Sequence, residues 1–158
     1  MEDAAGAEIV AICDRNPERL AIAGDSFGIM RRYAEADEML RAERPDFVDI
    51  ATTAPSHRPL VELAAGLGIA VIVQKPFATA LADAKAMVQA CRAAGVPLMV
   101  HENFRWQSPI LKVGEILQSG EIGEVFWGRV SFRSAYDVFS GQPYLAEGER
   151  FIVEDLGI

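Results

Sequence analysis

The sequence has few features of a secreted, membrane-bound or nucleic-acid-binding protein. Its 158 residues include only two cysteines, Cys13 and Cys91, and neither belongs to a CxxC pair or a Cys/His metal motif. No run approaches the roughly 18 to 20 apolar residues of a membrane-spanning helix, and the first residues are acidic, unlike a signal peptide. The net charge of −8 and the scattered arginines disfavour binding to phosphate backbones. We therefore expect a cytoplasmic protein with reduced cysteines, no membrane contact and no nucleic-acid partner.

The sequence does contain short apolar runs separated by segments with helical spacing. Aliphatic and β-branched residues dominate the runs at 8–13, 47–53, 69–73 and 96–101. Continuous runs of this kind are typical of parallel strands that are covered on both faces. Their alternation with helices predicts a doubly wound parallel α/β sheet of the Rossmann type.

Start and stop signals delimit the expected helices. Asn16 followed by proline is typical of a helix start, and Gly28 of its end. A second helix is expected from about His57, and Thr79 is expected to cap a third that ends at Gly95. The inner side of this third helix is expected to hold Leu81, Ala84, Val88 and Cys91.

The pattern changes after residue 107, which predicts a domain at 1–107 and the beginning of another at 108–158. Ser108 followed by proline begins a further expected helix, which Gly120 ends. Its inward residues are expected to be Ile110, Val113, Ile116 and Leu117. The aromatic-rich segment 124–134 is expected to form a longer strand.

Lys75 is the strongest single candidate for a functional residue. It follows an apolar run and Gln74, and it is followed by Pro76. Proline forces the preceding residue into an extended conformation, so the direction of the Lys75 side chain is set by the backbone. A lone lysine is usually a solvated surface charge, but the end of a buried strand favours a functional role, because open α/β sheets bind ligands at that edge.

Asp14 and Arg15 stand at the end of the first apolar run. In dinucleotide-binding sheets a carboxylate at such a position hydrogen-bonds the adenosine ribose hydroxyls; the alternative is an ordinary acid in a strand-to-helix turn. Asp14 would repel a 2′-phosphate, whereas Arg15 could pair with one. NAD is therefore favoured over NADP.

Two further segments follow strands at the same expected edge and could contact a cofactor. Their candidate residues are Thr52, Thr53, Pro55, His57, Asn103 and Arg105. The alternative for His57 is a residue at a helix start that is hydrogen-bonded to its own loop. The alternative for Arg105 is a surface side chain that stacks on Trp106.

Five motifs, in order and at matching spacing, resemble the Gfo/Idh/MocA family of sugar and cyclitol oxidoreductases. They are D-R-N-P-E-R at 14–19, T-x-A-P-S-H at 52–57, Q-K-P at 74–76, E-N-F-R-W at 102–106 and E-D-L-G-I at 154–158. The resemblance implies a Rossmann domain followed by an α+β substrate domain, an NAD or NADP cofactor, and a sugar or polyol substrate. It also implies a homo-oligomer in the full-length form.

The same resemblance implies roles for individual residues. Lys75 matches the lysine that lies beside the nicotinamide and the reacting hydroxyl, and Gln74 precedes it. Asp14 matches the residue that contacts the adenosine ribose, and the 52–57 turn matches contacts near the pyrophosphate and nicotinamide. Asn103 and Arg105 match polar positions after the last Rossmann strand. Asp155 matches the first acid of the family's D-x-G-x-H segment, which gives it a catalytic role.

The sequence departs from the family pattern in three places. Gln74 replaces a glutamate and removes a negative charge near Lys75, which predicts a retuned site. No G-x-G-x-x-G loop is present, so the strand that precedes it should be missing and the sheet should have a gap at its centre. The sequence ends at Ile158, where the family places a histidine next.

These departures lead us to expect part of a longer NAD(P)-dependent dehydrogenase that acts on a secondary hydroxyl or carbonyl of a sugar or cyclitol. One alternative is a self-standing protein of the same fold, acting as a non-catalytic dinucleotide-sensing regulator or scaffold. Another is an α/β domain that binds no dinucleotide.

Overall fold

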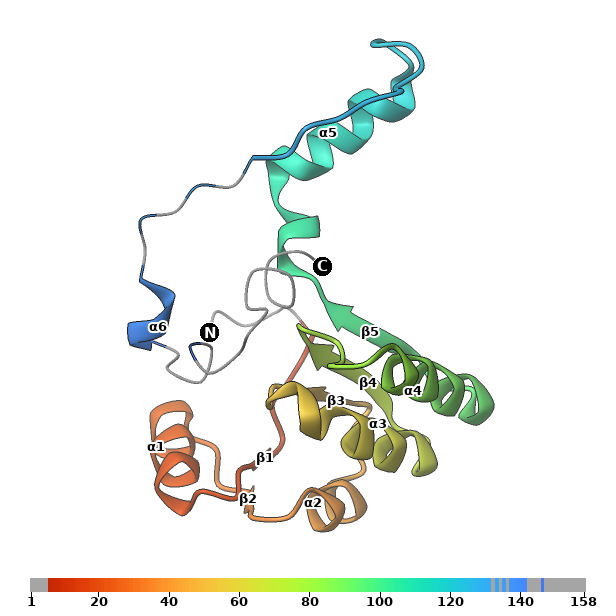
Figure 1. The fold of residues 1–158 in the computed structure, drawn as a ribbon. Coiled ribbons are helices and arrows are strands. Elements are labelled where there is room, and N and C mark those ends of the chain that lie inside the picture. Colours follow the sequence, from red (N-terminus) through yellow and green to blue (C-terminus); the bar gives the residue numbers. More distant parts are fainter. Residues whose placement is uncertain (1–5, 132, 134, 136, 142–145, 147–158) are drawn as a thin grey trace. The chain divides into compact units, whose positions relative to one another are not determined.

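The computed structural model describes residues 6–131, 133, 135, 137–141 and 146 (Figure 1). The chain divides into two compact units between Val100 and His101. Strands and helices alternate through the first unit, which confirms the predicted α/β class. No helix in the described part of the chain is long and apolar enough to cross a bilayer. Asp155 lies outside the described residues.

The strands of the described residues form two separate sheets. The strands are β1 (Ile12–Cys13), β2 (Arg32–Tyr33), β3 (Phe47–Ile50), β4 (Ala70–Gln74) and β5 (Leu98–His101). β1 pairs with β2 in parallel, and a three-stranded sheet has the order β3-β4-β5, in which β3 and β4 are parallel. Each of the four predicted runs overlaps one of these strands. β1, β3 and β5 are shorter than their runs, β4 is displaced by one residue from its run, and β2 is an additional strand.

The break between the sheets falls where the sequence predicts a gap. In the Rossmann order, the strand that carries the glycine-rich loop lies between the second and fourth strands. Here β1 and β3 occupy those two places, and no strand of the described region pairs with both of them. The separation into two sheets therefore confirms the predicted interruption.

The helices of the first unit begin and end mostly where the sequence signals stand. They are α1 (Pro17–Phe27), α2 (Ala36–Glu43), the short 3₁₀ turn η1 (Ala54–Ser56), α3 (His57–Gly66) and α4 (Leu81–Ala94). The Asn16 side chain accepts hydrogen bonds from the N–H groups of Glu18 and Arg19, and Gly28 ends α1 in the left-handed conformation. Thr79 does not cap α4: Ala80 is the capping residue, without a side-chain hydrogen bond.

One face of the three-stranded sheet packs against α3 and α4 (Figure 1). Val71 and Val73 of β4 point into this core, together with Val61 of α3 and Met87 of α4. One prediction about this sheet, that its strands are covered on both faces, is wrong. Phe47 and the other outward residues of the sheet remain partly exposed, so in the described part the strands are covered on one face only.

The predicted inner side of α4 is confirmed at Cys91, which is buried, and Ala84 and Val88 are half-buried. The prediction is wrong at Leu81, which is 71% exposed, and it omits Met87, which is fully buried. On a helix, Leu81 and Met87 are six residues apart and therefore point in different directions. Burial raises the pKa of the Cys91 thiol.

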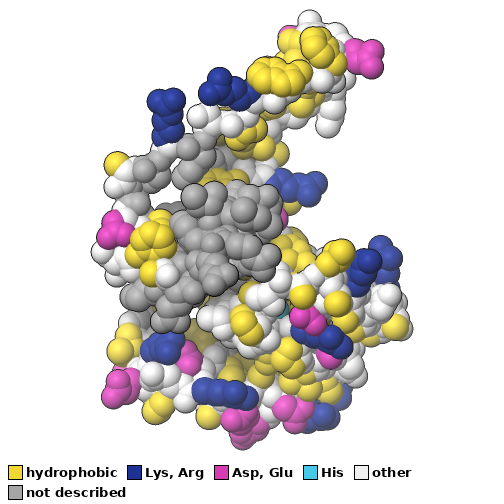
Figure 2. All heavy atoms as spheres, viewed as in Figure 1, with side chains coloured by type: hydrophobic (Ala, Val, Ile, Leu, Met, Phe, Trp, Pro, Cys, Tyr) yellow, Lys and Arg dark blue, Asp and Glu magenta, His cyan; other side chains and the backbone are white. Residues whose placement is uncertain are grey.

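The second unit contains η2 (Asn103–Trp106), α5 (Ser108–Ser119) and α6 (Val138–Gly141). The bounds of α5 confirm its prediction, but its apolar residues Ile110, Val113 and Leu117 are about half exposed. The strand expected at 124–134 is wrong for residues 124–131, which pair with no other described strand and leave Phe126 and Val130 almost fully exposed. Figure 2 shows hydrophobic side chains at the surface along α5 and the segment after it.

Candidate functional site

Lys75 directly follows the last residue of β4 and is half-buried. The Gln74 side-chain oxygen accepts a hydrogen bond from the Lys75 backbone N–H at 3.2 Å, and the Lys75–Pro76 peptide bond is cis. The carboxyl ends of β3 and β4 lie at the same edge of the sheet because these strands are parallel. The fold thus places Lys75 at the edge where open α/β sheets bind ligands.

The turn after β3 lies at this edge as well. The Ser56 hydroxyl oxygen is 2.8 Å from the Thr52 hydroxyl oxygen and 2.7 Å from the Thr53 carbonyl oxygen, which holds the turn in a compact form. Thr52, Thr53 and Pro55 remain exposed. Their side chains are therefore accessible to a ligand.

His57 connects this turn to the segment that carries Lys75. Its Nδ1 lies 3.1 Å from the Phe77 carbonyl oxygen, and its Nε2 lies 3.0 Å from the Thr52 carbonyl oxygen. The side chain is fully buried, at 0% exposure. The structure therefore brings the 52–57 turn and the 74–77 segment together, and a direct contact of His57 with a cofactor would require one of these two interactions to break.

No feature of the sequence predicts the interaction of His57 with Phe77. The partner there is a backbone carbonyl, which every residue carries, so the residue type carries no information about it. The position of His57 at the beginning of α3 did favour the alternative in which it bonds its own loop, and its interaction with Thr52 has that form.

Asp14 follows β1, at the corresponding end of the two-stranded sheet. One of its carboxylate oxygens accepts a hydrogen bond from the Asn16 N–H at 2.8 Å, and the other has no hydrogen-bond partner among the described residues. Arg15 lies 3.7 Å from the Glu35 carboxylate, in an exposed pair. Burial raises the pKa of the neighbouring Cys13 thiol, and the carboxylates of Glu35 and Asp14 raise it further.

Asn103 and Arg105 belong to the second unit, where both are exposed in η2. The Arg105 guanidinium carbon lies 5.4 Å from the centre of the Trp106 ring, which is the stacked arrangement of the alternative interpretation. Their role in binding a cofactor remains a prediction.

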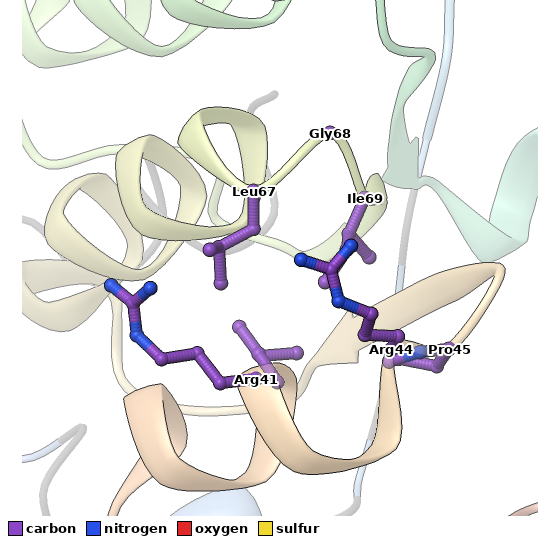
Figure 3. A pocket seen from close by; sticks show the side chains of 7 residues that line it. Arg41, Arg44, Pro45, Leu67, Gly68 and Ile69 are labelled. Atoms are coloured by element: carbon purple, nitrogen blue, oxygen red, sulfur yellow. The ribbon is translucent and has the colours of Figure 1, made fainter.

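A separate cavity of about 130 Å³ lies between the end of α2 and the turn from α3 to β4. Figure 3 shows the side chains that line it, among them Arg41, Arg44, Leu67 and Ile69. Pro45 and Ile69 stand just before β3 and β4, so this cavity is at the amino edge of the sheet, opposite Lys75. It therefore takes no part in the candidate site. Within the described residues, no group of three or more His, Cys, Asp or Glu side chains is arranged to hold a metal ion.

Comparison with protein families matches residues 1–102 to the Gfo/Idh/MocA family, described as an oxidoreductase family with an NAD-binding Rossmann fold. The chain is also similar to two D-apiose dehydrogenases. It is 71% identical to that of Paraburkholderia graminis, over 99% of this chain and 42% of the relative. It is 64% identical to that of Rhizobium rhizogenes, over 99% of this chain and 46% of the relative. The chain thus spans less than half the length of these curated relatives.

A solved structure with a similar fold is an oxidoreductase from Agrobacterium radiobacter in complex with NAD⁺, L-tartaric acid and magnesium. The two chains are 65% identical, with a TM-score of 0.93, over 96% of this chain and 44% of the other. A likeness of this extent includes residues of both units.

Proposed function

Because this chain belongs to the Gfo/Idh/MocA oxidoreductase family, we propose that the protein containing it is an NAD-dependent sugar dehydrogenase, with D-apiose as the first substrate to test. Residues 1–107 would form its cofactor-binding domain and residues 108–158 the beginning of its substrate domain. The full-length protein would be a homo-oligomer. The similarity to named dehydrogenases supports an enzyme over a non-catalytic regulator.

The observation that carries the proposal is the position of Lys75. It lies at the carboxyl edge of the three-stranded sheet, and His57 connects its segment to the exposed Thr52–Thr53 turn. The ammonium group of Lys75 and the accessible hydroxyl groups of Thr52 and Thr53 thus lie on two connected segments at the carboxyl edge of this sheet. A polar substrate with several hydroxyl groups suits such a set of donors and acceptors.

In the proposed reaction, Lys75 donates a hydrogen bond to the reacting hydroxyl oxygen of the sugar. Its positive charge favours loss of the hydroxyl proton, because it stabilises the negative charge that develops on the oxygen. Asp155 is proposed as a second catalytic group that exchanges protons at this oxygen. When bound, the nicotinamide ring supplies the hydride acceptor.

The residues around β1 fit the adenosine end of the cofactor. The second carboxylate oxygen of Asp14 can accept hydrogen bonds from ribose hydroxyls. The carboxylates of Asp14 and Glu35, which both raise the pKa of Cys13, would repel a 2′-phosphate. Arg15, which could pair with such a phosphate, already lies near the Glu35 carboxylate. This arrangement supports NAD over NADP. We propose contacts nearer the nicotinamide for Thr52, Thr53, Pro55, Gln74, Asn103 and Arg105. His57, predicted from the sequence as a further contact, would act there indirectly, through the Thr52 and Phe77 carbonyls that its ring joins.

The test is to replace Lys75 by alanine in the protein that contains this chain. We expect kcat with NAD⁺ and D-apiose to fall by about 10² or more, since a positioned proton-transfer group contributes roughly that factor. Lys85→Ala, at an exposed lysine of α4, is the matched control and should leave kcat unchanged. A Lys75→Ala variant that folds and keeps its turnover would refute the proposed role.

A further inference from the structure

His57 has an unusual set of hydrogen-bond partners. Both of its ring nitrogens lie at hydrogen-bond distance from backbone carbonyl oxygens, and a carbonyl oxygen can only accept. A neutral imidazole carries a single N–H, so it can donate to one of these carbonyls and not to both. With a neutral ring, one nitrogen lone pair would face an oxygen lone pair at about the contact distance of a hydrogen bond.

A doubly protonated ring satisfies both carbonyls. Each N–H then donates a charge-assisted hydrogen bond, which is roughly twice as strong as a neutral one. Burial of a charge is unfavourable unless hydrogen bonds compensate it, and here both N–H groups of the fully buried ring have a carbonyl acceptor.

The charged groups on neighbouring elements do not take part in the hydrogen bonds of the His57 ring. α3 carries Arg58 and Glu62, and α4 carries Asp83. Arg58 pairs with the Glu62 carboxylate at 2.8 Å and with the Asp83 carboxylate at 2.9 Å, on the outer side of these helices. In the described part of the chain the ring nitrogens of His57 contact the two carbonyls and no carboxylate. Two further charges are near these carbonyls in sequence: Lys75, two residues before Phe77, and Asp49 of β3, which is exposed and lies three residues before Thr52.

We propose that His57 is a positioning residue: its doubly protonated ring joins the Thr52 and Phe77 carbonyls and so fixes the segment that carries Lys75. Thr52 belongs to the turn after β3, and Phe77 follows Lys75 and Pro76 after β4. The two connections hold the carboxyl ends of both strands at a fixed separation. The consequence for catalysis rests on the proposed function of Lys75, whereas the protonation state of His57 does not.

The first experiment measures the protonation state by ¹⁵N NMR of the imidazole rings in the ¹⁵N-labelled protein that contains this chain. Signals that disappear in His57→Gln and persist in His101→Gln belong to His57. We expect both ring nitrogens to carry a slowly exchanging proton at neutral pH. A His57 ring with one unprotonated nitrogen would overturn the proposal, whatever the protein catalyses.

The second experiment separates positioning from general stability. His57→Phe keeps a ring of similar size without N–H groups, whereas His57→Gln keeps an amide that can donate. We expect kcat of the folded His57→Phe variant to fall by about 10- to 100-fold, as for a misplaced catalytic group, with NAD⁺ affinity nearly unchanged. His57→Gln should recover part of the loss.

Wild-type kcat in both variants would contradict the positioning role. Equal losses of kcat and NAD⁺ affinity would also contradict it, because they would indicate a general disruption of the edge. If His57→Phe does not fold, the comparison of His57→Gln with the wild-type protein decides between these outcomes. If Lys75→Ala leaves turnover intact while the His57 ring is doubly protonated, the proposed function fails and the structural part of this inference stands.

Discussion

The sheet of β3, β4 and β5 rests on a closed hydrophobic core, whereas the sheet of β1 and β2 is held largely by polar contacts. Val61, Val73 and Met87 in the first region are completely buried. In the second region the strands are two residues long and Ile29 is buried, whereas Leu40 of α2 packs into the core of the first region. The two halves of one α/β unit are therefore stabilised in different ways.

The polar contacts of the two-stranded half centre on Arg32. Its Nε donates to the Ile29 carbonyl at 2.7 Å, and a terminal nitrogen donates to the Asp25 carboxylate at 2.8 Å. The guanidinium passes so close to Gly24 that a Cβ there would lie 2.0 Å from Nε. A side chain at this helix position would therefore displace the Arg32 guanidinium from these two interactions.

The difference in stabilisation between the two halves corresponds to the different roles proposed for Lys75 and Asp14. Lys75, which would act on the reacting hydroxyl, follows the strand that lies deepest in the hydrophobic core. Asp14, which would bind the adenosine ribose, follows a two-residue strand. Catalytic groups require a more rigid support than groups that only bind, because small displacements reduce the rate strongly.

The largest expected effect on stability comes from truncating the core of the three-stranded half. Met87→Ala should lower the free energy of unfolding by about 2–5 kcal/mol, since it removes buried atoms and leaves a cavity. Ile22→Ala, on the exposed side of α1 where the isoleucine is 67% exposed, should change it by less than about 0.5 kcal/mol. Urea denaturation of both variants measures the contrast, and equal losses would remove the proposed difference between the halves.

An intermediate effect is expected at the beginning of α1, in the two-stranded half. Asn16→Ala removes the side-chain oxygen that accepts from two backbone N–H groups and should cost about 1 kcal/mol. Asn16→Asp keeps an acceptor at this position and should retain most of the stability. Urea denaturation is again the measurement. A loss in Asn16→Asp as large as that in Asn16→Ala would show that the cap does not support this half.

The sequence predicts the elements whose determinants are local. Asn16 and Gly28 delimit α1, Gly95 ends α4, and Ser108 begins α5, because caps and left-handed glycines act within one helical turn. The lack of a glycine-rich loop predicted the gap in the sheet, since strand order fixes which strand accompanies that loop. The placement of Lys75 at a strand end followed from the proline after it.

Features that depend on distant partners were not predictable in this way. The buried side of α4 is set by its contacts with α3 and by the core, so Met87 is buried and Leu81 is exposed, although the sequence pattern places Leu81 on the inner side. Residues 124–131 have the composition of a strand, but a strand needs a neighbour to pair with. The second partner of His57 is a carbonyl twenty residues away, which no residue type identifies.

The smallest expected effect concerns the polar link between β2 and α2. The Tyr33 hydroxyl donates to the Glu43 carboxylate, which also accepts from Arg31 at 2.6 Å. The bond from Tyr33, followed by that from Arg31, holds the pKa of Glu43 below its usual value, and the bond to Glu43 raises the pKa of Tyr33. A lowered carboxylate pKa stabilises the folded state above the unfolded pKa, near 4.5, and this contribution disappears as the pH falls through the lowered value.

Tyr33→Phe should therefore be less stable than the wild-type protein at neutral pH, and the difference should shrink as the solution is acidified below about pH 4. At alkaline pH the difference should also shrink, but only as the pH rises through the raised pKa of Tyr33, because the tyrosine must stay protonated to donate. Urea midpoints of the two proteins across this pH range measure the effect. A difference that does not depend on pH would mean that Tyr33 stabilises β2 through packing of its ring, and the two halves would then be more alike than the polar contacts indicate.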